Sequence, residues 1–292
     1  MNNNKIYPIY FTFGMLFIYS IFVFLPGLIG IFYSFTDWNS FSDELNFIGL
    51  ENYKTILKGD PIYLFYIGNT VKFTLLTTII KTLIGFVLAL VMINKNVRFR
   101  NIHRTIIFSP QVLSFLIVGL IFRSILHPSK GFLNTTLEAM NLGFLAKNWL
   151  GSIDWAFFSV IAVDIWKGVG YIMVVLIAGL NSIPQIYHEV AQIDGAGFFR
   201  RIIHITIPLL MPSITVVTVL NITYGLRVFD SIYVLTNGGP GYATGVVNTA
   251  VFKEFSKGRF GLGTAMSSLL FLFILLISYF LIKGLNKKAV EY

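Results

Sequence analysis

The sequence predicts an all-α integral membrane protein in which six helices cross the bilayer within one domain of 292 residues. Hydrophobic residues make up 55% of the chain and charged residues only 12%, a balance that is unusual for a soluble domain. Several apolar runs also reach the roughly 20 residues that a helix needs to cross about 30 Å of hydrocarbon. The predicted spans cover residues 9–33, 70–93, 105–126, 156–180, 209–234 and 264–282, and a more polar segment, residues 181–208, separates the fourth span from the fifth.

The composition excludes several classes of function. The chain has no cysteine and only four scattered histidines, so it offers no disulfide framework, thiolate metal site or cysteine nucleophile. Its net charge of +9 comes from basic residues at the ends of apolar runs, where they orient the spans, so no nucleic-acid partner is required. A membrane-embedded enzyme is disfavoured because the sequence has no clustered His, Asp or Glu ligands and no nucleophile with its base.

The first span, residues 9–33, follows the polar segment of residues 1–7 and is interpreted as an uncleaved helix. It is too long for the apolar part of a signal peptide, and bulky Tyr33, Phe35 and Trp38 stand where a cleavage site needs small residues. Pro26 is expected to kink this helix. The polar segment of residues 34–69 carries five acidic residues against two lysines, which weakly favours the outer side of the membrane.

The second span, residues 70–93, carries a stripe of small and polar side chains at steps of three and four, which should face protein and not lipid. The stripe comprises Thr74, Thr78, Lys81, Gly85 and Ala89. Because a charge is costly in the middle of a span, Lys81 is either part of a buried structural pair or a residue of the transport pathway. The buried pair is the favoured interpretation.

The orientation follows from the loop of residues 94–104, which holds Lys95, Arg98, Arg100 and Arg104 and no acidic residue. Positively charged loops stay in the cytoplasm, so this loop and both termini are predicted to be cytoplasmic, with Lys283, Lys287 and Lys288 anchoring the C-terminal end. The outer segment before the sixth span also contains basic residues, which conflicts with this rule. The early loop is taken to dominate.

The third to fifth spans contain further polar residues. The third span includes Pro110, and the fourth carries Asp164 and Lys167, which at a spacing of three can neutralise each other within one helix. In the fifth span Asn221, Tyr224 and Arg227 fall near one face. That face should point at partner helices or at a water-filled path for the solute.

The segment of residues 181–208 predicts a helix, a tight turn and a second helix. Pro184 suits the first helical position, and Ile186, Val190 and Ile193 recur at helical spacing. Asp194 and Gly195 end this helix, with Gly195 at positive φ and Asp194 capping the helix that follows. Such a helix pair is expected to lie at the membrane surface and to present a protruding binding surface to a soluble partner protein.

This segment resembles the E-A-A-x(3)-G-x(9)-I-x-L-P signature of permease subunits in binding-protein-dependent ABC importers. The match covers Glu189, Ala191, Gly195, Ile205 and Pro208, while Val190 and Ile207 replace the usual Ala and Leu with other apolar residues. Phe47 to Tyr53 and Leu235 to Pro240 resemble the F-x-G-L-x-N-Y and L-T-x-G-G-P stretches of sugar-type members. The resemblance implies that the segment, with Asp194 and Ala196 in its turn, couples the permease to an ATPase subunit.

The resemblance further implies an importer for a sugar or related solute in a bacterial-type cell membrane, in which this chain forms half of the membrane path. Its partners would be a second permease, favoured to be a different chain, two ATPase subunits and an extracytoplasmic solute-binding protein. The glycine clusters at residues 235–240 and 258–263 lack the G-x-x-x-x-G-K-[ST] order, so this chain is expected to bind no cofactor, and ATP and Mg belong to the ATPase.

The alternative is an ATP-independent secondary transporter or channel that uses Lys81, Asp164 and Lys167 to carry coupling ions. It leaves the surface helix pair unexplained, and the sequence has no apparent internal repeat of the kind many such transporters carry. The sequence does not identify the solute, because 29 Phe, 14 Tyr and 4 Trp residues are too many to single out those that line a path.

Overall fold

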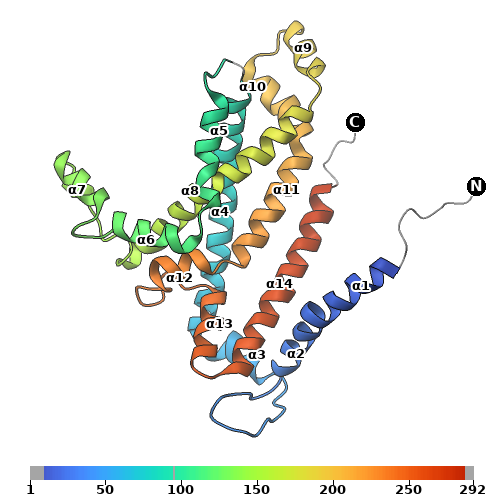
Figure 1. The fold of residues 1–292 in the computed structure, drawn as a ribbon, viewed down its shortest axis with the longest axis vertical. Coiled ribbons are helices and arrows are strands. Elements are labelled where there is room, and N and C mark those ends of the chain that lie inside the picture. The colour runs from blue at the N-terminus through green and yellow to red at the C-terminus, as the bar shows by residue number, and fades with distance from the viewer. Residues whose placement is uncertain (1–9, 95, 287–292) are drawn as a thin grey trace, which may run out of the picture. The chain divides into compact units, whose positions relative to one another are not determined.

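The computed structural model describes residues 10–94 and 96–286, and most of them are helical (Figure 1). Five helical runs in this part of the chain are long and apolar enough to cross a membrane: Thr12–Tyr33, Pro61–Ile93, Ile153–Ser182, Phe198–Leu226 and Phe260–Leu281. A sixth candidate is a pair of helices, Arg100–Val112 and Phe115–Ile125, bent by 99°. The predicted all-α membrane class is confirmed. The basic residues Lys95, Lys287 and Lys288 lie outside the described residues.

The chain forms two compact units, of which the first comprises residues up to 64 together with residues 250–272. It contains α1 (Tyr10–Tyr19), α2 (Leu25–Tyr33), α3 (Glu51–Lys54), most of α13 (Val247–Ser256) and the first half of α14 (Phe260–Asn286). Side chains of the stretch from Phe47 to Tyr53 fix the loop after α2. Asn52 donates hydrogen bonds to the carbonyls of Ser34 and Thr36 at 2.9 and 2.8 Å, and the Tyr53 hydroxyl lies 2.6 Å from Ser34 Oγ.

The second unit comprises residues 65–249 and 273 onward, and it holds most of the polar residues selected from the sequence. Its helices are α4 (Pro61–Ile93), α5 (Arg100–Phe108), α6 (Phe115–Ile125), α7 (Phe132–Ala139), α8 (Ile153–Ser182), α9 (Ile186–Ile193), α10 (Phe198–Arg201), α11 (Ile207–Leu226) and α12 (Asp230–Thr236). The helix α8 is central, because it packs against α5, α11 and α12. Two apolar clusters form around it, one including Phe73 and Val160 and the other Ile172 and Leu210.

The face of α4 that the sequence assigned to protein contacts is buried, as predicted. Thr74, Thr78, Lys81, Gly85 and Ala89 are all buried. A Cβ atom at Gly85 would lie 2.8 Å from Ile172 Cγ2, so the absence of a side chain lets α4 approach α8 closely.

The third span is not the continuous helix that was predicted for residues 105–126. After α5 the chain forms a short 3-10 turn, Ser109–Val112, and Leu113 is extended (φ −69°, ψ 140°). The Ser114 hydroxyl then accepts the Ile117 N–H and starts α6 in a new direction. Gly119 permits close packing of α6 on α12, since a Cβ there would overlap Val234.

The fifth span also differs from the predicted residues 209–234. The helical run begins at Phe198, includes Pro208 and Pro212, and ends at Leu226. A π-helical turn, Ile202–Thr206, directly precedes Ile207 and Pro208, and a similar turn, Ser20–Phe24, precedes Pro26 in the first span. Because proline has no N–H and its ring crowds the preceding turn, a widened turn lets each helix continue through it.

Candidate functional site

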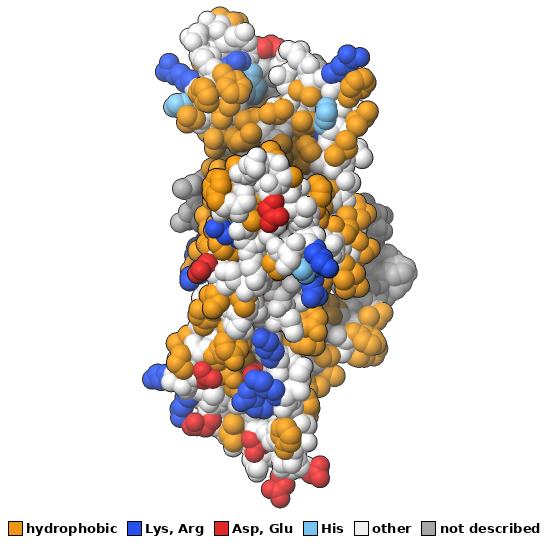
Figure 2. Space-filling view, turned by 90° about the vertical axis from the view of Figure 1, so that its left-hand side faces the viewer, with side chains coloured by type: hydrophobic (Ala, Val, Ile, Leu, Met, Phe, Trp, Pro, Cys, Tyr) orange, Lys and Arg blue, Asp and Glu red, His pale blue; other side chains and the backbone are white. Residues whose placement is uncertain are grey.

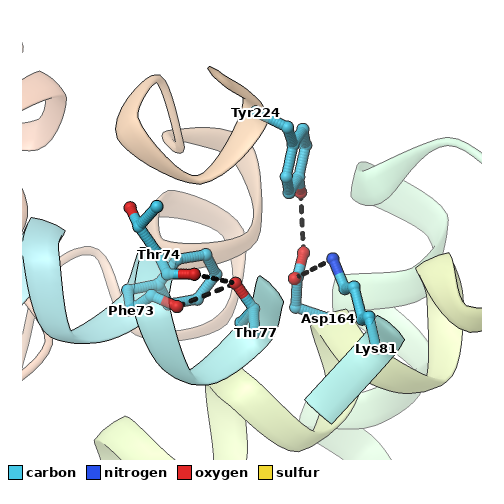
Figure 3. Close-up of polar contacts among 6 residues, drawn as sticks. All are labelled: Phe73, Thr74, Thr77, Lys81, Asp164 and Tyr224. Carbon is cyan, nitrogen blue, oxygen red and sulfur yellow. Dashed lines mark hydrogen bonds and ion pairs between the residues drawn. The ribbon is translucent and has the colours of Figure 1, made fainter. Parts of the chain in front are cut away.

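A buried ion pair lies between α4 and α8 in the second unit. Lys81 Nζ is 2.5 Å from Asp164 Oδ2, and the two side chains are only 4% and 1% exposed. Tyr224 of α11 donates a hydrogen bond of 2.6 Å from its hydroxyl to Asp164 Oδ1. Figure 3 shows Lys81 and Tyr224 directed at the same carboxylate. Burial of a charge is costly unless it is paired and hydrogen-bonded, and here Asp164 has both kinds of partner.

Lys167 does not pair with Asp164, although their spacing in the sequence predicted that it would. Its ammonium group donates a hydrogen bond of 3.0 Å to the carbonyl of Gln111 and lies 4.6 Å from the ring centroid of Phe115. Gln111 belongs to the break between α5 and α6, which exposes backbone oxygens that a continuous helix would use internally, and Phe115 is the first residue of α6. The favoured interpretation of Lys81 as part of a buried pair is confirmed, and its partner is Asp164 of α8.

These groups border a cavity of about 240 Å³. Its walls combine charged and amide groups with aromatic rings, namely Lys81, Gln111, Phe115, Asp164, Lys167, Tyr171, Asn221 and Tyr224. Two ammonium groups face one carboxylate, so the lining carries a net positive charge. The Asn221 side chain is buried, and its Nδ2 has no hydrogen-bond partner in the described part of the chain. A buried donor of this kind is available to a bound molecule.

Two of the three path residues selected in the fifth span line this cavity. Asn221 and Tyr224 do, whereas Arg227 caps the C-terminal end of α11 and has an exposed side chain. Sequence reasoning missed Gln111, Phe115 and Tyr171. The position of Tyr171, one turn beyond Lys167 on the same helix, was a readable signal. Gln111 and Phe115 reach the cavity through the break in the third span, for which Pro110 was the only sequence signal.

The segment between α8 and α11 contains the predicted helix and turn. The helix α9 ends at Ile193, its C-cap is Asp194, and Gly195 follows with a φ of 75°. Two hydrogen bonds close the turn: Gly195 N–H to the Gln192 carbonyl at 3.1 Å and Ala196 N–H to the Ala191 carbonyl at 2.8 Å. This pair of bonds is the Schellman ending of a helix, in which a glycine adopts the left-handed conformation. The prediction that Gly195 ends this helix at positive φ is confirmed.

The prediction that Asp194 caps the second helix is wrong. Asp194 is the last residue of the α9 ending and does not cap α10, because Gly197 holds the N-cap position without a side-chain hydrogen bond. Pro208, at the end of the predicted segment, lies within the helical run of the fifth span. Glu189 is exposed and accepts a hydrogen bond of 2.7 Å from Gln185 Nε2, while Ala191 is buried. Burial, and to a lesser degree the charge of Arg201, lower the pKa of His188.

The apolar stripe of α9 is exposed. Ile186 and Val190 are about half exposed, and Ile193 is 85% exposed. Three apolar side chains at helical spacing without cover on this chain form a surface of the type that binds a partner protein.

Comparison with known proteins agrees with this geometry. Residues 81–290 match the family described as binding-protein-dependent transport system inner membrane component. The chain is 35% identical to the probable ABC transporter permease protein YurN of Bacillus subtilis, over 95% of each chain. It is also 35% identical to the trehalose/maltose transport system permease protein MalF of Thermococcus litoralis, over 87% of this chain and 85% of that protein.

A solved structure has the same fold over nearly the whole chain. It is a crystal structure of a bacterial alginate ABC transporter in complex with an alginate pentasaccharide-bound periplasmic protein. A chain of that transporter is 25% identical with a TM-score of 0.80, over 94% of this chain and 93% of its own length. The chain described here therefore belongs to the inner-membrane components of binding-protein-dependent transport systems, and it is a permease subunit of an ABC importer.

Proposed function

We propose that this permease forms half of the membrane path for a sugar or related solute, and that α9 couples it to a separate ATPase subunit. The exposed apolar stripe of α9, held by the glycine turn at Gly195, is the observation that carries the coupling. The name of the Thermococcus litoralis relative and the alginate transporter support a saccharide as the solute.

The cavity beside Asp164 has the chemistry that a saccharide requires. The rings of Phe115, Tyr171 and Tyr224 offer apolar faces on which a sugar ring can stack. Asn221 and Gln111 offer amide groups for hydroxyls, and the ion pair holds the surrounding helices in register. Its net positive lining also suits a solute that carries a carboxylate or a sulfonate.

The proposed coupling needs a partner that covers α9. An ATPase subunit with an apolar cleft would bury Ile186, Val190 and Ile193, and it would bind the ATP and Mg of the cycle. Closure of two such subunits around nucleotide would move α9 and switch the spans between inward and outward openings. Glu189, Ala191, Asp194, Gly195 and Ala196 form or flank the helix end that must fit the cleft, and Pro208 belongs to the span that follows.

The remaining partners of the proposed complex follow from the family. A second permease, favoured to be a different chain, would complete the path, and an extracytoplasmic solute-binding protein would deliver the solute. The complex of the alginate transporter with a periplasmic protein that holds an alginate pentasaccharide supports the latter partner. The basic residues Arg100 and Arg104 and the α9 segment border one hollow of the second unit, so they lie on the same side of the spans. With the positive loop in the cytoplasm, α9 and both termini are cytoplasmic, in a bacterial-type cell membrane.

Replacement of Ile193 by aspartate tests the coupling. Because Ile193 contacts water in the isolated chain, the substitution leaves insertion intact, while a charge placed in the apolar cleft should release the ATPase and abolish uptake. Phe144→Asp is the matched control, since Phe144 is 73% exposed but lies in the short turn Gly143–Leu145 after α7. If Ile193→Asp keeps the ATPase and full uptake while Phe144→Asp does the same, the coupling role of α9 is wrong and an ATP-independent transporter becomes the better proposal.

A further inference from the structure

The second unit has a large hollow between the ends of its spans and the α9 segment. Its volume is about 800 Å³, and its walls come from the ends of α4 and α8, from α5, and from α9 and the residues on both sides of it. The solute cavity beside Asp164 shares no lining residue with it. The hollow therefore lies on the loop side of the unit and is distinct from that cavity.

The lining of this hollow is basic. Arg100, Arg104 and Arg201 line it together with His188, and none of the described residues that line it is acidic. Figure 2 shows Lys or Arg and His side chains around the upper end, where α9 and α10 lie in Figure 1. Three guanidinium groups without a carboxylate among the lining residues attract an anion.

Two of the arginines have donors that the chain does not use. Arg104 donates from Nη2 to the Met92 carbonyl at 2.5 Å, which fixes its side chain at the end of α4. Its Nε and the Nε of Arg201 are buried and have no hydrogen-bond partner among the described residues. A buried guanidinium donor without an acceptor is unfavourable, and a tetrahedral oxyanion such as phosphate accepts hydrogen bonds from several arginines at once.

The lining of the hollow also contains apolar side chains, namely Leu90, Ile93, Leu180, Ile183, Phe198 and Ile202. A soluble phosphate would leave these side chains uncovered, whereas a phospholipid places its phosphate beside the start of its acyl chains. Basic pockets between spans on the cytoplasmic side are typical binding sites of anionic lipids. We propose that this hollow binds the phosphate group of an anionic phospholipid through Arg104 and Arg201.

Such a lipid would bridge the two parts of the unit that border it. Arg104 belongs to α5 and contacts the end of α4, whereas Arg201 stands just after the α9 turn and Gln185 just before α9. A lipid held by both arginines fixes the position of α9 relative to the spans. In this respect the inference rests on the proposed coupling role of α9, but the binding itself does not.

The test measures lipid binding to the purified importer complex by native mass spectrometry, after incorporation into nanodiscs of phosphatidylcholine with phosphatidylglycerol. We expect retained phosphatidylglycerol on the wild-type complex and a loss of roughly fivefold in affinity for each of Arg104→Gln and Arg201→Gln, the effect typical of one basic residue near an anionic membrane. Arg98→Gln and Arg200→Gln are the matched controls, because both side chains are exposed and neither lines the hollow. These controls should retain the lipid.

Each other outcome overturns the inference. Equal retention by all four variants places the lipid elsewhere. If inorganic phosphate at millimolar concentration displaces the lipid and itself binds with the same dependence on Arg104 and Arg201, the site is one for a soluble phosphate. If Arg201→Gln releases the ATPase with its bound lipid unchanged, the arginine contacts an acidic segment of the ATPase. Because lipid retention is read without ATP hydrolysis, a failure here is distinguishable from a failure of the coupling proposal.

Discussion

Asp164 of α8 accepts a hydrogen bond from Tyr224 of α11 while it is paired with Lys81 of α4, so one carboxylate joins three spans. The Tyr224 hydroxyl oxygen lies 2.6 Å from Asp164 Oδ1, and Lys81 Nζ lies 2.5 Å from Asp164 Oδ2. A carboxylate with these two partners on different helices fixes how the helices pack beside the cavity. Its removal should affect both folding and transport.

We predict that Asp164→Asn and Lys81→Met each destabilise the protein by about 3–5 kcal/mol, because each leaves one buried charge without its partner. The double variant should recover much of this loss, since both charges are then absent. Thermal unfolding of the purified chain in detergent measures the effect. Additive losses in the double variant would show that the two side chains do not stabilise each other.

Asn221→Ala should reduce uptake roughly two- to tenfold while the complex still assembles. This is the value of the one hydrogen bond that the Asn221 side chain would donate to the solute. Tyr224→Ala should reduce uptake further because it removes a ring from the cavity as well as the bond to Asp164. Arg227→Ala should have little effect because Arg227 does not line the cavity. Val216→Ala is a control on the same helix and should leave uptake unchanged, because Val216 does not line the cavity. Unchanged uptake in both Asn221→Ala and Tyr224→Ala would show that these two residues do not contribute to the path.

Gly195→Val should weaken ATPase association and uptake without affecting membrane insertion. A β-branched residue at φ 75° is strained, by about 1–3 kcal/mol, and the turn after α9 would change. Gly195→Asn should be milder, because asparagine tolerates this conformation. Gly197→Ala is the matched control: its φ is −66° and a Cβ there meets open space. Co-purification of the ATPase measures the result, and equal effects of Gly195→Val and Gly197→Ala would contradict it.

Cysteine labelling tests the orientation, because the chain has no cysteine of its own. A cysteine at position 43 should react with a membrane-impermeant maleimide in intact cells, and one at position 98 should react only after lysis. The opposite pattern would place α9 outside the cell and remove it from any contact with an ATPase.

The lowered pKa of His188 predicts that the α9 segment is less stable in acid. Because the pKa in the ordered segment lies below the value of about 6.5 in an unfolded chain, the ordered segment favours the neutral ring. Its stability is complete above about pH 6.5 and is lost as the pH falls through the lowered value. Amide hydrogen exchange at residues 186–196, corrected for intrinsic rates, should therefore show less protection at pH 5.5 than at pH 7.5. His188→Gln should remove this difference.

The features that depend on residues close together in the sequence were predicted correctly. Apolar length located the spans, the spacing from Thr74 to Ala89 identified the buried face of α4, and Gly195 marked the helix ending. The sequence did not show which lysine would pair with Asp164, because Lys167 is close in the chain whereas Lys81 is close only in the fold. Local spacing cannot rank these two partners.

The sequence indicated that prolines disturb the spans, but it did not show which proline would break one. Pro26, Pro110 and Pro208 each disturb a helix, but two of them follow a π-helical turn and leave the span continuous, whereas Pro110 lies where the span breaks. The difference depends on tertiary contacts: α6 packs on α12 after the break, and Lys167 uses the Gln111 carbonyl. Neither contact is visible from the residues around Pro110.

The spans on the two sides of α9 differ in the regularity of their helices. On one side, α8 runs from Ile153 to Ser182 without a proline or a widened turn, and Asp164 lies about 27 Å along it from Ser182 at 1.5 Å per residue. On the other side, the run into α11 contains a π-helical turn and two prolines. In the proposed coupling, a displacement of α9 passes through Ile183 and Pro184 to the end of α8, and the uninterrupted helix connects that end with Asp164.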